Sequence, residues 1–185
     1  MERSFEVGNG RVLLVRGDIT REDTEAIANA ANSALLGGGG VDGAIHRAAG
    51  PRLLEACKEV KKGLVGGLLA TGEAVLTPGF DLKARYVIHC VGPVYAEEGA
   101  EAPRLLASCY ANALRLCRER GIRSVAFPSI STGIYGYPVE LAAPIALGTV
   151  REALERYEVP GLVKFVLFDE ATFRAYEAAA KKALA

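Results

Sequence analysis

The chain has 185 residues, of which 50% are hydrophobic and 24% are charged. This is the composition of a folded globular protein, so it excludes a chain that is disordered throughout. The 22 Lys and Arg residues balance the 22 Asp and Glu residues, and this neutral chain lacks the basic surface that strong binding to duplex nucleic acid requires. At roughly 100–200 residues per domain, we expect a single domain over residues 1–185.

No run of about 18 consecutive apolar residues occurs, and the first residues, MERSFEV, lack the apolar segment of a secretory signal. The four cysteines show neither CxxC nor zinc-ligand spacing, and Cys90 lies in a hydrophobic run. We therefore expect a soluble, cytoplasmic protein with no membrane partner. We also expect a monomer that needs no metal and no cofactor.

The first part of the chain predicts a hairpin, a third strand and two helices. The hairpin is favoured by the Gly8-Asn9-Gly10 turn, because Asn-Gly supplies the positive φ angles of a tight connection. In chain order, the expected elements are strands at Ser4–Val7, Arg11–Arg16 and Glu25–Ala30, a glycine loop at Ser33–Gly40, and helices at Gly43–Ala49 and Arg52–Lys62.

The second part predicts strands that alternate with helices. Pro144 lies close to the first turn of the helix expected after Pro138, which allows that helix a later start. In chain order, the expected elements are strands Ala74–Thr77 and Arg85–Val91, a helix over Leu105–Cys117 that ends at Gly121, strand Ser124–Phe127, a loop through Tyr137, the helix after Pro138, strand Val163–Phe168, and a helix capped by Asp169.

This alternation predicts an α/β fold, a three-layer α/β/α sandwich with a central mixed sheet. Ligands of such sheets bind beyond the carboxyl ends of the central strands, where loops lead into helices. The two glycine-bearing loops occupy that kind of position.

The first loop holds four consecutive glycines between Asn32 and Asp42. A glycine loop has no side chains to cover its N–H groups, and these add to the free N–H groups of the helix that follows. Together they form an anion site. A flexible connector is the plainer alternative, but it would not need the flanking asparagines and aspartate. The run also fits the GxGxxG pattern of dinucleotide-binding folds, although the preceding strand and the following acidic residue stand at the wrong distances.

The second loop, Pro128–Tyr137, follows an expected buried strand and offers another backbone cradle with serine and threonine hydroxyls. Tyr135 lies between glycines, so we expect it to be exposed and to pack on a ribose, or else to anchor the loop.

Several polar residues have simpler interpretations. Asp18 can form a turn or an N-cap, and Asp42 can cap the helix that follows it. His46 comes one helical turn after Asp42 and can contact it, but a packed or surface histidine is favoured. His89 and Cys90 are adjacent on an expected strand, so they point to opposite faces and make a poor metal pair.

Gly17-Asp18-Ile19-Thr20, the Asn29–Ile45 stretch and the Ser131–Gly136 loop together resemble the macro domain family, in its MacroD-type class. The resemblance covers nearly the whole chain, from about Arg11 to the last helix. It implies an α/β/α fold that binds ADP-ribose.

The resemblance also implies a role for each matching residue. Asp42 would be the catalytic carboxylate, and Asn32 would hydrogen-bond the distal ribose. The remaining substrate-binding positions are Asp18 and Ile19 at the adenine, Phe168 on the adenine face, Gly40 and Val41 on one side of the pyrophosphate, and the backbone of Ser131, Thr132, Gly133, Ile134 and Tyr135 on the other, with Tyr135 also packing on the distal ribose.

The implied function is hydrolysis of ADP-ribosyl esters. O-acetyl-ADP-ribose and mono-ADP-ribose attached to acidic side chains are the expected substrates, which makes mono-ADP-ribosylated proteins the expected partners. One alternative is a reader module that binds ADP-ribose without turnover, and another is a nicotinamide-dependent oxidoreductase. The presence of Asn32 together with Gly-Gly-Val-Asp42 favours the hydrolase.

Overall fold

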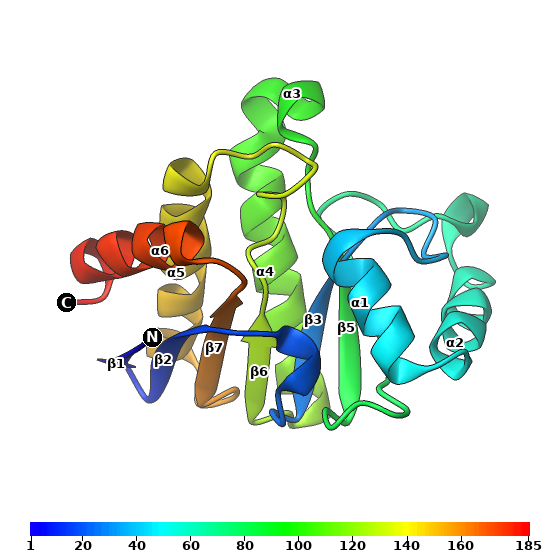
Figure 1. Ribbon diagram of the computed structural model, residues 1–185, viewed down its shortest axis with the longest axis horizontal. Coiled ribbons are helices and arrows are strands. Elements are labelled where there is room, and N and C mark those ends of the chain that lie inside the picture. Colours follow the sequence, from blue (N-terminus) through cyan, green and yellow to red (C-terminus); the bar gives the residue numbers. More distant parts are fainter.

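The strands of the protein form one seven-stranded sheet in the order β1-β2-β7-β6-β3-β5-β4, in a computed structural model that describes all residues 1–185 (Figure 1). The strands are β1 (Glu2–Val7), β2 (Gly10–Arg16), β3 (Ala26–Ala31), β4 (Ala74–Pro78), β5 (Tyr86–Val91), β6 (Ser124–Phe127) and β7 (Leu162–Leu167).

Five central strands, β2, β7, β6, β3 and β5, are mutually parallel, whereas β1 and β4 pair antiparallel at the two edges. The expected mixed sheet and the expected hairpin of β1 with β2 are therefore confirmed. Because the five central strands run the same way, their carboxyl ends meet along one edge of the sheet.

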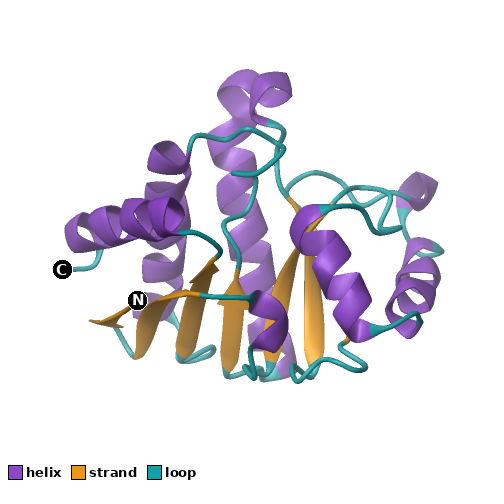
Figure 2. Cartoon of the chain, viewed as in Figure 1, coloured by secondary structure: helices purple, strands orange, loops and turns teal.

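Helices cover both faces of this sheet (Figure 2). Helices α4, α5 and α6 supply the larger hydrophobic core on one face, and α1 and α2 supply the smaller core on the other. The helices are α1 (Gly40–Ala49), α2 (Arg52–Lys61), α3 (Tyr95–Glu98), α4 (Ala102–Arg120), α5 (Val139–Arg156) and α6 (Glu170–Ala183), with short 3-10 turns at Ile19–Arg21, Val65–Gly67 and Gly99–Glu101. The three-layer α/β/α sandwich is confirmed.

Side chains alternate between the two cores along each strand, as strand geometry requires. In β5, Ile88 and Cys90 join the core under α4–α6, whereas Val87 joins the core under α1 and α2. His89 follows the same alternation, so it lies on the α1–α2 face, where the Cys57 side chain of α2 meets it.

One helix start near the cleft differs from the sequence prediction, and another settles an open alternative. Helix α1 begins at Gly40, three residues earlier than expected, with the Gly43 N–H bonded to the Gly39 carbonyl at 3.2 Å. Gly40 has a φ of 56°, a value that glycine adopts freely, and the poor helix propensity of glycine hid this first turn. Helix α5 begins directly after Pro138, at Val139, and accommodates Pro144 in its interior. The expected start after Pro138 is therefore confirmed, and the alternative of a later start is wrong.

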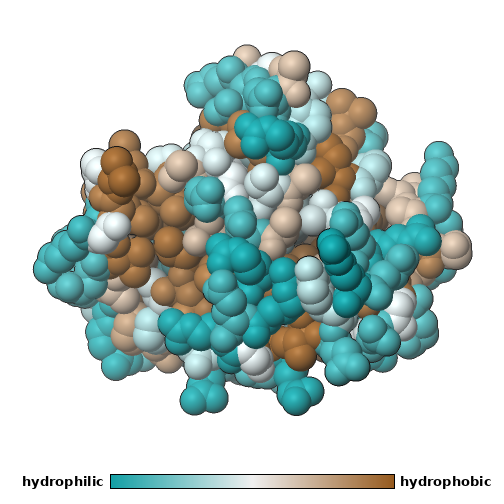
Figure 3. Space-filling model, turned by 180° about the vertical axis from the view of Figure 1, so that it is seen from behind, coloured by the Kyte–Doolittle hydropathy of each residue, from teal (hydrophilic) through white to brown (hydrophobic).

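Seen from behind, the surface mixes hydrophilic and hydrophobic areas, with a hydrophobic area at the upper left (Figure 3). The exposed large hydrophobic residues include Val65 and Leu68, which follow α2 in the chain. None of the helices combines the length and the hydropathy that crossing a membrane requires.

Candidate active site

A cleft of about 710 Å³ lies at the carboxyl edge of the five parallel strands. The residues that directly follow these strands line it: Gly17 after β2, Phe168 after β7, Pro128 after β6, Asn32 after β3 and Gly92 after β5. This volume is within the usual range for small-molecule sites.

The structure brings all twelve residues of the predicted site into this one cleft. They come from four separate segments of the chain: Asp18 and Ile19; Asn32, Gly40, Val41 and Asp42; Ser131, Thr132, Gly133, Ile134 and Tyr135; and Phe168. A single elongated ligand can therefore reach every one of them.

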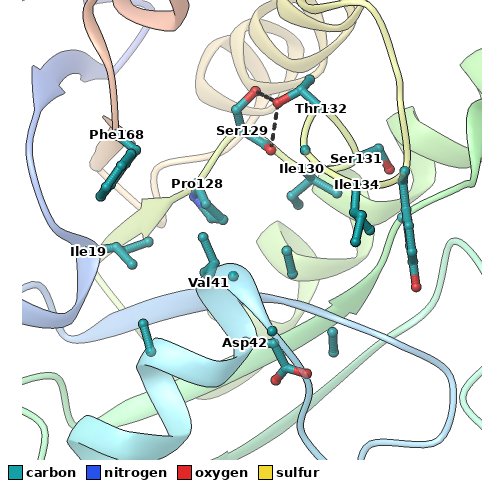
Figure 4. Close-up of a pocket in the computed structure, with 18 of the residues that line it drawn as sticks. Ile19, Val41, Asp42, Pro128, Ser129, Ile130, Ser131, Thr132, Ile134 and Phe168 are labelled. Carbon is teal, nitrogen blue, oxygen red and sulfur yellow. Dashed lines mark hydrogen bonds between the residues drawn. The ribbon is translucent and has the colours of Figure 1, made fainter.

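One end of the cleft is apolar and carries a carboxylate. The rings and methyl groups of Phe168 and Ile19 lie there (Figure 4), with Ile19 buried and Phe168 exposed. Asp18 accepts hydrogen bonds from the N–H and the hydroxyl of Thr20, at 3.0 and 2.7 Å, through Oδ1 alone. These bonds lower the pKa of Asp18, so it is an ionised acceptor as well as the N-cap that the sequence allowed.

The loop after β6 lines the middle of the cleft and presents unpaired donors. The N–H groups of residues 131–135 donate to no acceptor within the protein. The loop is held from behind, because the Thr132 hydroxyl contacts the Ser129 carbonyl and hydroxyl at 3.1 and 2.7 Å (Figure 4), and Tyr137 N–H donates to the Ser131 carbonyl at 2.9 Å. Ser131 has a φ of 68°, in the left-handed region, and such a residue in a loop can let successive N–H groups form a concave anion-binding surface.

The N-terminus of α1 forms the opposite side of the middle section, where Val41 faces the loop (Figure 4). The N–H groups of Gly39, Gly40 and Val41 also donate to no protein acceptor, as expected for a first helical turn. Arg47 is the only Lys or Arg among the lining residues. The middle of the cleft thus offers two facing sets of unpaired backbone N–H groups, which are the donors that bind anions at helix N-termini and in backbone loops.

Asp42 lies at the other end of the cleft and is 5% exposed. Its Oδ1 accepts a hydrogen bond from Asn29 Nδ2 at 2.8 Å and lies 3.4 Å from His46 Nε2. Its Oδ2 makes no hydrogen bond within the protein. A β-carbon at Gly38 would lie 3.3 Å from this Oδ2 and 3.4 Å from Asn32 Nδ2, so the carboxylate and the amide converge on one small space.

Two expectations about this end, and one plainer alternative, are wrong. Asp42 does not cap α1, because the helix starts earlier and Gly39 is its N-cap. His46 is not simply a packed or surface residue, since one helical turn brings its ring to the carboxylate. Tyr135 is half-buried rather than exposed, and burial together with the negative charge of Asp42 raises the pKa of its hydroxyl.

Asn32 uses Nδ2 to reach the Gly37 carbonyl at 3.2 Å, while its buried Oδ1 has no hydrogen-bond partner. The Ser131 hydroxyl is likewise buried and unpaired. Buried polar atoms without partners are costly, so they point to polar groups that a ligand supplies. No group of three His, Cys, Asp or Glu side chains has the arrangement of a metal site.

Sequence reasoning did not assign Asn29 or His46 to the site. The signal for His46 was its spacing of four residues from Asp42, and the signal for Asn29 was its position on the same strand face as Ile27 and Ala31. Arg47, Ser129 and Gly92 also line the cleft without having been predicted.

The family model of the Macro domain matches residues 28–146. The chain is 53% identical over 169 residues to the O-acetyl-ADP-ribose deacetylase of Cronobacter turicensis, covering 91% of this chain and 95% of that protein. It is 51% identical over 166 residues to the O-acetyl-ADP-ribose deacetylase of Salmonella newport, covering 90% and 92% of the two chains.

Solved structures agree with these matches. A glycine-to-valine variant of the Oceanobacillus iheyensis macrodomain, solved with ADPR, superposes with a TM-score of 0.95 at 47% identity, and 98% of each chain is covered. The Trypanosoma brucei macrodomain in complex with ADP-ribose gives a TM-score of 0.82 at 44% identity over 91% of this chain and 68% of that one. On the strength of the family model and of relatives at more than half identity, this chain belongs to the macro domain family.

Proposed function

We propose that this protein binds ADP-ribose in the cleft and hydrolyses ester derivatives of it, with O-acetyl-ADP-ribose as one substrate. The observation that carries the proposal is the order of chemistry along a single cleft. An apolar end with an ionised acceptor is followed by two facing sets of free N–H groups and then by a buried carboxylate. The relatives named O-acetyl-ADP-ribose deacetylase support the same substrate.

The charge distribution of ADP-ribose matches this order. Its two phosphates lie between neutral groups, and backbone N–H groups stabilise such a charge without lysine or arginine side chains. In the proposed complex, adenine lies between Ile19 and Phe168 with its amino group toward Asp18. The pyrophosphate lies between Val41 and the 131–135 loop, and the distal ribose lies beside Asn32 and Tyr135.

The reaction that we propose uses the free oxygen of Asp42. Oδ2 accepts a proton from a water molecule while the water oxygen bonds to the acyl carbon of the ester. The bond between the acyl carbon and the ribose oxygen then breaks, and the proton held by Asp42 passes to that ribose oxygen. Acetic acid, which ionises, and ADP-ribose leave. Asn32 orients the ribose during these steps. Proton transfer by a positioned side chain, here Asp42, typically increases the rate by about 10²–10⁴-fold.

The proposal extends to mono-ADP-ribose attached to Glu or Asp side chains, because that linkage is also an acyl ester. Mono-ADP-ribosylated proteins are then partners of a single-domain monomer that acts in the cytoplasm. All four cysteines are free and buried, which suits a reducing compartment.

The test is to incubate the protein with O-acetyl-ADP-ribose and with a glutamate-modified protein, and to measure free ADP-ribose. We expect release from both substrates, and in ¹⁸O-labelled water the label should enter acetate. Tight ADP-ribose binding without release from either ester would instead identify a reader module. Release of ADP-ribose that itself carries the label would overturn attack at the acyl carbon.

A further inference from the structure

Behind Asp42, polar side chains from three neighbouring strands and one helix form a buried cluster that the proposed reaction does not use directly. Asn29 and His89 are direct neighbours across β3 and β5, and neither has any exposed surface. Thr77 of β4 and Cys57 of α2 complete the cluster at 2% and 1% exposure. Polar groups buried this deeply in a core are costly unless each has a defined partner.

The hydrogens of this cluster can be assigned from its contacts. Asn29 Nδ2 lies 2.8 Å from Asp42 Oδ1 and 3.2 Å from His89 Nδ1. An ionised carboxylate only accepts, so the amide must turn its nitrogen toward Asp42. The second hydrogen of that nitrogen then points to His89 Nδ1, which must accept.

His89 is therefore neutral, with its hydrogen on Nε2. That nitrogen lies 2.9 Å from the Thr77 hydroxyl and 3.8 Å from Cys57 Sγ. An imidazolium would set a second hydrogen against the Asn29 amide. Burial lowers the pKa of His89 to about 3, in agreement with a neutral ring.

The arrangement decides which oxygen of Asp42 is free. Asn29 and His46 both contact Oδ1, so Oδ2 is the oxygen that faces Gly38 and Asn32. We propose that His89 is a positioning residue: its Nδ1 fixes the Asn29 amide, and the amide holds Asp42 with Oδ2 directed into the cleft. This inference rests on the proposed function, and it concerns a histidine that does not line the cleft.

Two substitutions separate positioning from packing. His89→Asn retains an acceptor near the place of Nδ1 but leaves a cavity, whereas His89→Leu fills the space and retains no acceptor. Positioning predicts that kcat falls at least 10-fold in His89→Leu and less than about 3-fold in His89→Asn, with ADP-ribose affinity within about 3-fold of wild type in both. Ile88→Val, on the opposite face of β5, is the control and should keep the wild-type kcat.

A second measurement does not depend on turnover. Nitrogen-15 NMR of the wild type should show His89 as the neutral ring protonated on Nε2, and the Asn29 side-chain amide should exchange slowly with solvent. Exchange should become faster in His89→Leu and stay slow in His89→Asn.

The outcomes separate this inference from the function on which it rests. A wild type without esterase activity refutes the proposed function, and the Asn29 exchange rates then still decide whether His89 positions the amide. An active wild type with equal kcat values in His89→Leu and His89→Asn, or with unchanged Asn29 exchange in His89→Leu, overturns the role of His89.

Discussion

The hydroxyl of Ser131 occupies the space that a β-carbon at residue 92 would need, so Gly92 and Ser131 are in direct contact at the end of β5. The side chain of Ile130 crowds the same point. The loop that carries the free N–H groups is thereby seated against the backbone of a neighbouring strand. The geometry of the proposed phosphate site depends on the absence of a side chain at this position.

Gly92→Ala should push the 130–131 segment away from the sheet and lower ADP-ribose affinity about 10-fold or more, because positioned N–H donors lose alignment when the loop shifts. Calorimetric titration with ADP-ribose measures the effect. Gly148→Ala in α5 is the matched control, since no atom beyond its own helix backbone and chain neighbours lies within 4 Å of the added carbon. That variant should bind normally and gain about 0.5–1 kcal/mol of stability.

At the adenine end, Asp18→Asn should separate the two roles of Asp18. The amide oxygen can still accept from Thr20 N–H, so the N-cap and the free energy of unfolding should be nearly retained. The second oxygen becomes an NH₂ group, which repels the amino group of adenine. We expect ADP-ribose affinity to fall by about 1.5–3 kcal/mol, as for loss of a hydrogen bond to a charged group. Unchanged affinity by calorimetry would limit Asp18 to the turn.

Gly133→Glu should abolish ADP-ribose binding without unfolding the protein. No atom lies within 4 Å of a β-carbon at Gly133, so the chain accepts the side chain, but its carboxylate enters the proposed phosphate site. Like charges at close range in a partly desolvated cleft repel by several kcal/mol, on the order of magnitude that Coulomb's law gives. Gly133→Ala is the control and should bind within a few-fold of wild type. Native affinity in the Glu variant would mean that the phosphates bind elsewhere.

The free energy of unfolding should depend on pH through His89. The folded ring has a pKa of about 3, below the ordinary value of 6.5, so between these values the unfolded chain binds the extra proton. This contribution to stability is complete above pH 6.5 and is lost as the pH falls toward 3, with a slope of up to about 1.4 kcal/mol per pH unit.

Urea unfolding of wild type and His89→Asn at several pH values between 7 and 4 tests this linkage (roughly the window in which the ring titrates in the unfolded chain). The two proteins differ only at residue 89, so the change of their stability difference with pH reports on His89. That difference should shrink as the pH falls. A constant difference across the range would mean that His89 titrates normally in the folded state.

The sequence was sufficient for the layers, the sheet class and the outline of the cleft. Short apolar runs predict strands, and glycines mark the loops between elements, so both can be recognised locally in the sequence. The motifs shared with the macro domain family gave the twelve lining positions. It was not sufficient for His89, because the contact of this residue with Asn29 depends on which strands are neighbours in the sheet. Strand order is set by packing of the whole chain, and nothing in the local pattern of β5 specifies it.

The first turn of α1 shows a second limit. Glycine has poor helix propensity, so the run of glycines concealed a helix start at Gly40 and left a capping role for Asp42 open as an alternative. The actual start turns Asp42 inward, beside Asn29, with His46 one turn later. The sequence thus indicated Asp42 as the catalytic residue, whereas its partners Asn29 and His46 became visible only in the tertiary structure.

Asp42→Asn and Asn32→Ala should distinguish a catalytic site from a binding site. Asp42→Asn keeps an acceptor for Asn29 but removes the charge and the basic oxygen at Oδ2, so hydrolysis of O-acetyl-ADP-ribose should fall by about 10²-fold or more. ADP-ribose affinity should change only a few-fold, because the adenine and pyrophosphate contacts remain, and loss of a negative charge near the phosphates favours binding.

Asn32→Ala should lose rate in the same way through poorer orientation of the ribose. Lost rate with retained binding marks groups that act mainly in the transition state. Rates and dissociation constants measured on the same preparations decide the matter, and full activity in Asp42→Asn would remove Asp42 from the mechanism.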